Sequence, residues 1–389
     1  MTPATADAIV VGGGVVGAAI AAEVSRGGRS VIVIEQSDPA AAVSGGSLAC
    51  VGTHLADVDE LALLAWSCEA WSMLAGEAGC TIEYRRCGQL RFIDDPADWE
   101  GAQRWTAAER ARGLRAELLA PADVRSIEPA LEGAIFGATW SPDDAVVNPF
   151  LAVRALLAIA RRHGARILTR TPVLGVELSG GRVAGVRTRD GRIAAPAVIL
   201  AAGPWTAKLA ATADLALPIE PRKAQCLATA ALPPTIRTVV GAYRPAGGVE
   251  AGYTQIQQAH SGQVLFNTVL GGGLSPGGTG MDRVPEIDRR FLRDSVTTLL
   301  RLFPSLAQAQ LLRSWVRYEA VTPDDRFCIG PAGPPGLFVA AGDAGTGFVR
   351  APGIGRLIAA RLDGAPPPFR SDVYDAARFD APRELGARA

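Results

Sequence analysis

Residues 8–17 read Ala-Ile-Val-Val-Gly-Gly-Gly-Val-Val-Gly, an apolar run followed at once by a glycine-rich turn. The first four residues are typical of a buried strand, and a helical pattern follows the turn as far as Arg26. A second apolar run covers residues 30–34 and ends in Glu35. The segment therefore predicts a strand, a turn, a helix and a second strand within about 30 residues.

Three glycines of this turn have separate roles. Gly12 permits the tight turn, Gly14 lets the backbone approach a pyrophosphate, and Gly17 lets the helix pack closely on the strand. The N–H groups at the start of the helix then point at the phosphates. Glu35 ends the second strand, where its carboxylate would accept hydrogen bonds from ribose hydroxyls. The pattern predicts a Rossmann-like domain that binds a dinucleotide without a 2′-phosphate.

Three later segments favour FAD over NAD as this dinucleotide. Residues 44–47 (SGGS) follow the second strand, where small residues and hydroxyls can admit a second stretch of ligand. Residues 201–203 (AAG) end a later strand beside the adenosine half. Residues 342–348 (GDAGTGF) precede the last helix, which we expect over about residues 352–362. They aim backbone N–H groups at one point, where they would stabilise the negative charge of a reduced flavin. The predicted FAD-binding residues are Gly12, Gly14, Val15, Val16, Gly17, Glu35, Gln36, Ser44, Gly45, Ser47, Val173, Ala202, Gly203, Gly342, Gly345, Thr346, Gly347 and Phe348.

The length of 389 residues suggests two or three domains. Long alternating strands and loops rich in glycine and proline distinguish residues 214–320, and residues 81–95 alternate like a β-hairpin. We expect an α/β plus antiparallel β fold, in which a Rossmann-like FAD-binding domain carries an inserted substrate domain with a mixed or antiparallel sheet. The FAD-binding domain would comprise residues 1–85, 145–213 and 321–389, and the substrate domain residues 86–144 and 214–320.

Composition excludes several other classes of function. Basic and acidic residues number 39 each, so the formal charge is zero and gives no sign of a nucleic-acid partner or of a polybasic membrane surface. The six cysteines contain no CxxC pair, and the three histidines stand at no metal-ligand spacing, so we expect no zinc or iron–sulfur site. The N-terminus lacks a leader pattern and no unbroken apolar run reaches 18 residues, which predicts a cytoplasmic protein.

Four further blocks of sequence carry a family resemblance. They are residues 200–205 (LAAGPW), 221–225 (PRKAQ), 322–331 (TPDDRFCIGP) and 342–356 (GDAGTGFVRAPGIGR). With the N-terminal motif, they make the chain similar to the FAD-dependent amino acid and amine oxidoreductases grouped with D-amino acid oxidase, glycine oxidase and sarcosine oxidase. The last two blocks are especially similar to β subunits of multi-subunit dehydrogenases that act on sarcosine, proline, hydroxyproline or opines.

The resemblance implies a flavin ring at the junction of the two domains and hydride transfer from the substrate to flavin N5, giving an imine that hydrolyses. The substrate would be a small amine or amino acid, such as a secondary amine or a D-amino acid. Candidate partners are an electron acceptor other than oxygen and other subunits of a heteromeric dehydrogenase. The candidate substrate-site residues are Arg222, Arg317, Glu319, Tyr253 and Phe348, followed by Arg350 and Tyr318.

One position departs clearly from the family pattern. In many relatives an arginine three residues before the Thr-Pro-Asp block clamps the substrate carboxylate, and in this chain that position is Glu319. A glutamate there would repel a carboxylate or bind a cationic group. Three readings therefore remain: an amine or amino acid dehydrogenase, an oxidase that uses oxygen directly, and a noncatalytic FAD-binding subunit.

The lysine content favours the dehydrogenase among these readings. A fixed positive charge near flavin N5 would stabilise the superoxide that forms when oxygen takes an electron. Related sarcosine oxidases use a lysine of the substrate-domain sheet, whereas this chain offers only Lys208 and Lys223. The sheet segment expected to face N5, residues 263–273, contains neither lysine nor arginine.

We predict that the flavin is held noncovalently. Sarcosine oxidases of the monomeric type attach it through a cysteine shortly before the Thr-Pro-Asp block, and Arg317 occupies that position here. Acid precipitation should therefore leave colourless protein and yellow supernatant. Flavin fluorescence that stays with the denatured band on a gel would contradict this expectation.

Overall fold

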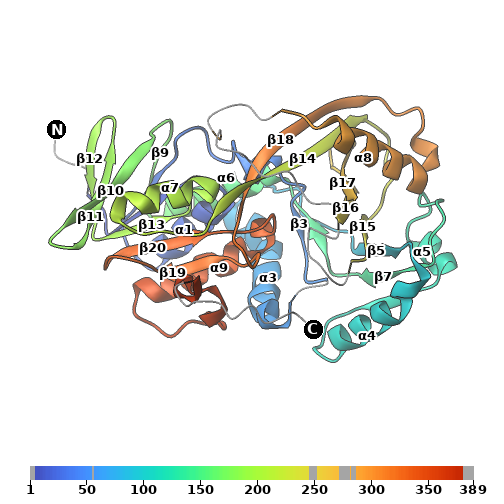
Figure 1. Cartoon of the computed structure of the whole chain (residues 1–389), viewed down its shortest axis with the longest axis horizontal. Coiled ribbons are helices and arrows are strands. Elements are labelled where there is room, and N and C mark those ends of the chain that lie inside the picture. The colour runs from blue at the N-terminus through green and yellow to red at the C-terminus, as the bar shows by residue number, and fades with distance from the viewer. Residues whose placement is uncertain (1–4, 55–56, 245–251, 271–280, 282–285, 380–389) are drawn as a thin grey trace.

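The computed structural model describes residues 5–54, 57–244, 252–270, 281 and 286–379. Its elements form two halves, each built around one large sheet (Figure 1). The first half contains a six-stranded sheet in the order β19-β20-β13-β1-β2-β9. These strands are β1 (Ala8–Val11), β2 (Val31–Ile34), β9 (Arg166–Leu168), β13 (Ala197–Leu200), β19 (Cys328–Pro331) and β20 (Leu337–Ala341).

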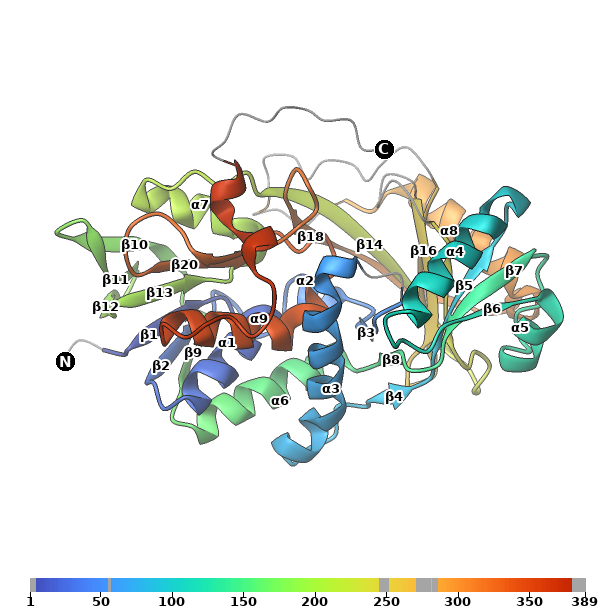
Figure 2. The same ribbon diagram turned by 90° about the horizontal axis from the view of Figure 1, so that it is seen from below.

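The predicted strand–turn–helix–strand unit lies at the centre of this sheet. Strand β1 pairs in parallel with β2 and with β13, and all residues of these three strands are buried. Burial on both faces explains why they read as continuous apolar runs. The helices on one face are α1 (Val15–Arg26), α3 (Leu61–Ala78), α6 (Pro149–Arg162) and α9 (Gly347–Leu362), as Figure 2 shows.

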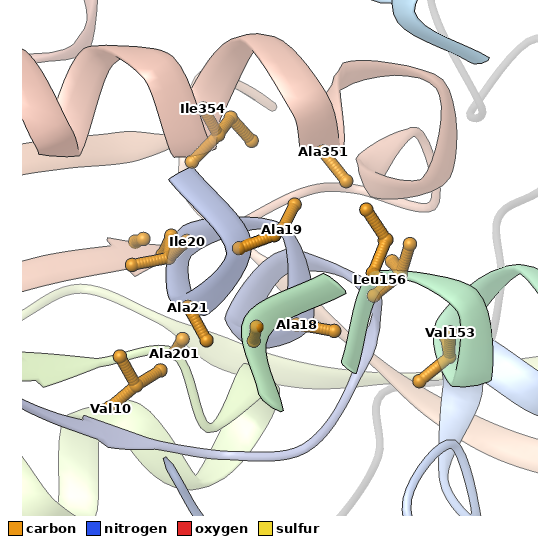
Figure 3. Close-up of a cluster of buried hydrophobic side chains, with 14 of the residues drawn as sticks. Val10, Ala18, Ala19, Ile20, Ala21, Val153, Leu156, Ala201, Ala351 and Ile354 are labelled. Carbon is orange, nitrogen blue, oxygen red and sulfur yellow. The ribbon is translucent and has the colours of Figure 1, made fainter. Parts of the chain in front are cut away.

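Helix α1 is the inner helix of this layer, and small side chains let its neighbours approach. Ala18 and Ala19 lie between α6 and α9 (Figure 3), where they meet Leu156 and Ile354. A Cβ atom on Gly355 of α9 would lie 2.6 Å from the Ala19 carbonyl oxygen, so the two backbones are nearly in contact there. The alanine-rich sequence of α1 therefore sets the short distance between α1 and its neighbouring helices.

Smaller elements surround this half. A three-stranded antiparallel sheet contributes to a second apolar cluster that includes residues from the other side of β1 and β2. It is the meander that the Gly180-Gly181 and Asp190-Gly191 turns predict. Its strands are β10 (Val173–Ser179), β11 (Arg182–Thr188) and β12 (Gly191–Ala194); the remaining short elements are α2 (Val43–Gly46), α7 (Thr206–Ala210), β3 (Cys50–Val51), β4 (Arg85–Arg86) and β8 (Ala145–Val146).

The second half is an eight-stranded mixed sheet in the order β18-β14-β17-β16-β15-β5-β7-β6. Strands β14 and β18 are long enough to run from this half toward the first one (Figure 1). The strands are β5 (Gln89–Ile93), β6 (Glu117–Leu119), β7 (Gly137–Ser141), β14 (Glu220–Ala231), β15 (Val239–Ala242), β16 (Gly252–Gln258), β17 (Gln263–Leu270) and β18 (Leu311–Val321). The helices of this half are α4 (Trp99–Arg110), α5 (Pro121–Ile127) and α8 (Arg289–Leu302).

The α/β plus antiparallel β class is confirmed. The strands of the second half lie within residues 86–144 and 214–320 except at the end of β18, which extends to Val321. The exact domain boundaries stay a prediction. Among the described helices, none combines the length and apolar character needed to cross a bilayer.

Two local expectations were wrong. Residues 81–95 do not form a hairpin, because β4 pairs with β8 while β5 pairs with β7 and β15. The last helix begins at Gly347, five residues before Pro352, so the proline lies inside it. The helix was expected over about residues 352–362, so its end was placed correctly and its first turn was missed.

We predict opposite stability effects for two helical glycines. A Cβ on Gly17 would lie 2.0 Å from the Gly12 carbonyl oxygen, whereas a Cβ on Gly76 of α3 would meet nothing within 4 Å. Gly76→Ala should stabilise the protein by up to about 1 kcal/mol through helix propensity. Gly17→Ala gains the same helix propensity, but the added methyl group must push α1 away from the turn after β1. We therefore expect this variant to have a lower thermal midpoint than the wild type. Equal midpoints for the two variants would show that this contact is not tight.

Candidate cofactor and substrate site

The first half contains a cavity of about 470 Å³ at the carboxyl ends of β1 and β2 and the start of α1. It gathers segments that are far apart in the sequence, as a dinucleotide cradle in an open parallel sheet does. Of the predicted FAD-binding residues, those that line it are Gly12, Gly14, Val15, Val16, Glu35, Gln36, Ser44, Val173, Ala202 and Gly203.

Close backbone contacts shape this cradle. Gly12 has a φ angle of +115°, and a Cβ there would lie 2.3 Å from the carbonyl oxygen of Ala201. Gly17 does not line the cavity, because it packs against Gly12 as described above. Side chains at these two positions would push the turn away from β13 and from α1, so the turn needs glycine at both, as a pyrophosphate-binding turn does, and the residues present fit the group that the sequence predicts.

Two side chains already satisfy N–H groups at this turn. The Glu35 carboxylate accepts from the backbone N–H of Gly13 at 2.6 Å and of Ser37 at 2.8 Å. The Ser44 hydroxyl accepts from the Val15 N–H at 2.9 Å. Glu35 is thus held at the end of β2, and Ser44 brings the 43–49 loop to the N-terminus of α1.

A second cavity of about 380 Å³ adjoins the first, with Val15, Val43, Ser44 and Asp343 lining both. Its walls are the 43–49 loop, the turn before α9 and one face of the eight-stranded sheet. Ser47, Gly345, Thr346 and Phe348 line it. Gly45, Gly342 and Gly347 instead support these walls, since their Cα atoms pack against Ala40, Thr322 and Asp343 respectively.

The turn before α9 is fixed from both sides. The Ala344 N–H donates to the Ala320 carbonyl of β18 at 2.8 Å, and the Asp343 carboxylate accepts from the Gly347 N–H at 3.3 Å. Ala344 and Gly345 both have positive φ angles, +46° and +84°, which makes the tight reversal. The N-terminus of α9 therefore lies at the wall of the second cavity.

Hydrogen bonds also tie the 43–49 loop to the second half. Trp315 of β18 donates its indole N–H to the Gly46 carbonyl at 3.0 Å. Gln257 of β16 donates its amide to the Leu48 carbonyl at 2.6 Å. The loop between the cavities thus takes its position from both halves of the molecule.

Glu319 and Arg222 form an ion pair at one end of the second cavity. They face each other across β14 and β18, with Arg222 Nη2 at 3.1 Å from Glu319 Oε2 and from the Ala344 carbonyl oxygen. Burial raises the pKa of Glu319 to about 7, and the charge of Asp343 adds to this effect although Arg222 opposes it. Glu319 therefore changes charge near neutral pH.

The other candidate residues lie at several depths. Tyr253, Arg317 and Arg350 line the second cavity, and Arg350 pairs with Glu60 behind it. Phe348 is only 5% exposed, because its ring stacks on Trp71 of α3 with the centroids 5.1 Å apart. Tyr318 is not among the lining residues, since strand alternation turns it to the face opposite Arg317 and Glu319.

Sequence reasoning missed several residues of the second cavity, notably Arg91 and Gln89 of β5, Asn267 of β17 and Cys226 of β14. Burial raises the pKa of the Cys226 thiol to about 12, so it is a weak nucleophile. Strand alternation could have identified one of these residues from the sequence, because it places Cys226 on the same face of the sheet as the candidate Arg222.

Comparisons with known proteins agree with this geometry. The chain is 28% identical to 4-methylaminobutanoate oxidase (formaldehyde-forming) of Paenarthrobacter nicotinovorans over 95% of its own length, which is 45% of that relative. It is 27% identical to the glycine oxidase of Geobacillus kaustophilus, covering 98% of this chain and 97% of the relative. The crystal structure of L-proline dehydrogenase from P. horikoshii superposes with a TM-score of 0.88 at 26% identity, covering 97% and 98% of the two chains.

The chain thus spans about half of the first relative and nearly all of the other two. The model of the DAO family, described as FAD dependent oxidoreductase, matches residues 7–361, which include both cavities and the turn before α9. Together with the cradle at Gly12 and Glu35, this match shows that FAD is the cofactor. The chain belongs to the DAO family of FAD-dependent oxidoreductases.

Proposed function

We propose that this protein is a dehydrogenase that oxidises the C–N bond of a small amine or amino acid. The observation that carries the proposal is the second cavity, which opens onto the FAD cradle and has polar side chains from the substrate sheet along one wall. A cavity of about 380 Å³ suits a small molecule.

When bound, FAD supplies the oxidant that accepts a hydride from the carbon next to the amine nitrogen. The amine nitrogen supplies the electron pair of the new C=N bond and loses a proton, and water hydrolyses the imine. The tasks left to the chain are to orient the carbon, to exclude bulk water and to hold the amine neutral. The side-chain amide of Asn267, with a carbonyl oxygen that accepts no hydrogen bond from the described residues, is placed to take an N–H of the substrate.

The named activities of relatives support this substrate class. Glycine oxidase, L-proline dehydrogenase and 4-methylaminobutanoate oxidase are named for compounds that carry both an amine and a carboxylate. Secondary amines such as sarcosine, proline, hydroxyproline and opines, together with D-amino acids, are therefore the compounds to test first. The competing hypothesis is a noncatalytic FAD-binding subunit. A complete lack of turnover with these compounds would favour it.

The placement of the lysines supports a dehydrogenase. Lys223 alternates away from the cavity-facing side of β14, and Lys208 is exposed at the edge of the first cavity. Residues 271–273 of the segment expected to face N5 lie outside the described residues. One observation favours an oxidase instead: Arg317 and Arg91 both line the second cavity, and neither has a carboxylate within ion-pair distance among the described residues.

We predict that an amine or amino acid from this panel bleaches the flavin anaerobically and that a dye or quinone reoxidises it faster than oxygen does. The physical reason is the absence of lysine from the cavity wall in the described part of the chain. Stopped-flow absorbance with each acceptor measures both steps.

Fast, saturating oxygen reduction with peroxide release would overturn the dehydrogenase assignment and favour the oxidase. Flavin that no member of the panel reduces would overturn the catalytic proposal itself.

We also predict a pH-dependent penalty for α-amino acids. Below pH 7 Glu319 is neutral and tolerates a nearby carboxylate, and above pH 7 it ionises and repels one. If only the protonated form binds, KM for sarcosine or proline should rise about tenfold per pH unit above 7. The substrate amine titrates in the same way with both enzymes, so its effect cancels in the ratio of the wild-type KM to the KM of Glu319→Gln. A ratio that does not change between pH 6 and 9 would show that Glu319 does not face the carboxylate.

A further inference from the structure

A row of side chains crosses the sheet on the wall of the second cavity, away from the Glu319 end. Arg91 of β5 is in register with Gly241 of β15, Gly241 with Gln255 of β16, and Gln255 with Asn267 of β17. Arg91, Gln255 and Asn267 all line the cavity. Three polar side chains from strands that are distant in sequence therefore lie along one line.

Arg91 extends across this row rather than out of the sheet. A Cβ on Gly241 would lie 2.3 Å from Arg91 Nη1, so the guanidinium lies directly over the glycine and reaches toward β16. The missing side chain at Gly241 thus lets the charge reach the middle of the cavity wall. Two strand spacings, roughly 10 Å, separate β15 from β17.

Gln89 holds the guanidinium in place and connects it to the Asp144 carboxylate, without a direct ion pair among the described residues. The side-chain amide of Gln89 lies between Arg91 and Asp144. Its oxygen accepts hydrogen bonds from Arg91 Nη2 at 2.7 Å and from Arg91 Nε at 3.2 Å, and its nitrogen donates to Asp144 Oδ2 at 2.8 Å. No carboxylate lies within 4.0 Å of Arg91 among the residues that the structure describes. Burial lowers the pKa of Arg91, and the negative charge of Asp144 opposes this effect without cancelling it.

At the other end of the row, the side-chain oxygen of Asn267 has no hydrogen-bond donor among the described residues. The residue is 7% exposed. Its amide nitrogen makes only long contacts, 3.5 Å to the Tyr253 hydroxyl and 3.6 Å to Cys226 Sγ. The row therefore presents an anion site at Arg91 and an acceptor for N–H at Asn267.

Building on the proposed function, we propose that Arg91 binds a substrate carboxylate that lies several bonds away from the oxidised amine. The amine donates an N–H to Asn267, and the chain between the two groups lies along Gln255. Glu319 lies in the wall of the same cavity away from Arg91, and its own carboxylate disfavours a substrate carboxylate close to the amine. The substrates are amino acids in which a carbon chain separates the amine from the carboxylate.

The first test uses the wild-type holoenzyme. N-Methyl ω-amino acids with two to five methylenes between nitrogen and carboxylate are compared with the same compounds as primary amides, and with sarcosine. We expect the carboxylate to lower KM relative to the amide by roughly 10–100-fold at the best length, as a charge-assisted pair does. Equal KM values for acid and amide at every length, or a preference for sarcosine, would overturn the proposal.

The second test asks whether Arg91 causes that preference. In Arg91→Gln the ratio of amide KM to acid KM should fall to about one, while KM for the amide stays near the wild-type value. Arg91→Lys, which keeps a charge, should restore part of the preference. Arg125→Gln, at an exposed arginine of α5, is the matched control and should keep the full ratio.

A ratio that survives in Arg91→Gln would overturn the assignment of this residue. The outcome that no amine of any kind bleaches the flavin would overturn the proposed function as well. Amines that bleach it regardless of a carboxylate would overturn only the present inference, so the two failures are distinguishable.

Discussion

The antiparallel ladder between β14 and β18 is the constraint on which the site depends. It runs from the pair Thr229 and Leu311 in the second half to the pair Glu220 and Val321 beside the first half. At that end, the Ala320 carbonyl accepts the hydrogen bond that fixes the turn before α9. A shift of one residue in this register would turn Glu319 and Arg317 to the other face of the sheet, and the cavity would lose one charged wall.

Local sequence patterns predicted much of the fold because they report local physics. The apolar run at residues 8–11 and the glycines after it indicated both a strand and a turn, and the structure has both. The side chain of Asn148 accepts from the N–H groups of Phe150 and Leu151, as expected of a residue that precedes a helix beginning with proline. Helix α3 covers residues 61–78, as its apolar spacing predicts.

Non-local pairing explains what could not be predicted. The neighbours of β5 come from residues 137–141 and 239–242, and no pattern within β5 identifies either partner. Arg91 therefore lay in a segment where alternation indicated only a hairpin, although its position depends on a glycine about 150 residues away. Phe348 was found from its glycine-rich context, but its stacking on Trp71 depends on how α3 and α9 pack. Glu319 was recognised because it departs from a pattern, and the sequence alone could not show that Arg222 faces it.

The two hydrogen bonds from Trp315 and Gln257 to the 43–49 loop have a thermodynamic consequence. This loop contacts the cradle through Ser44, and the substrate sheet holds it in place. The free energy of cofactor binding is therefore more favourable, because binding does not have to order the loop. Linkage is reciprocal, so bound cofactor must in turn stabilise the substrate half against local unfolding. We therefore expect the two halves to unfold together in the holoprotein.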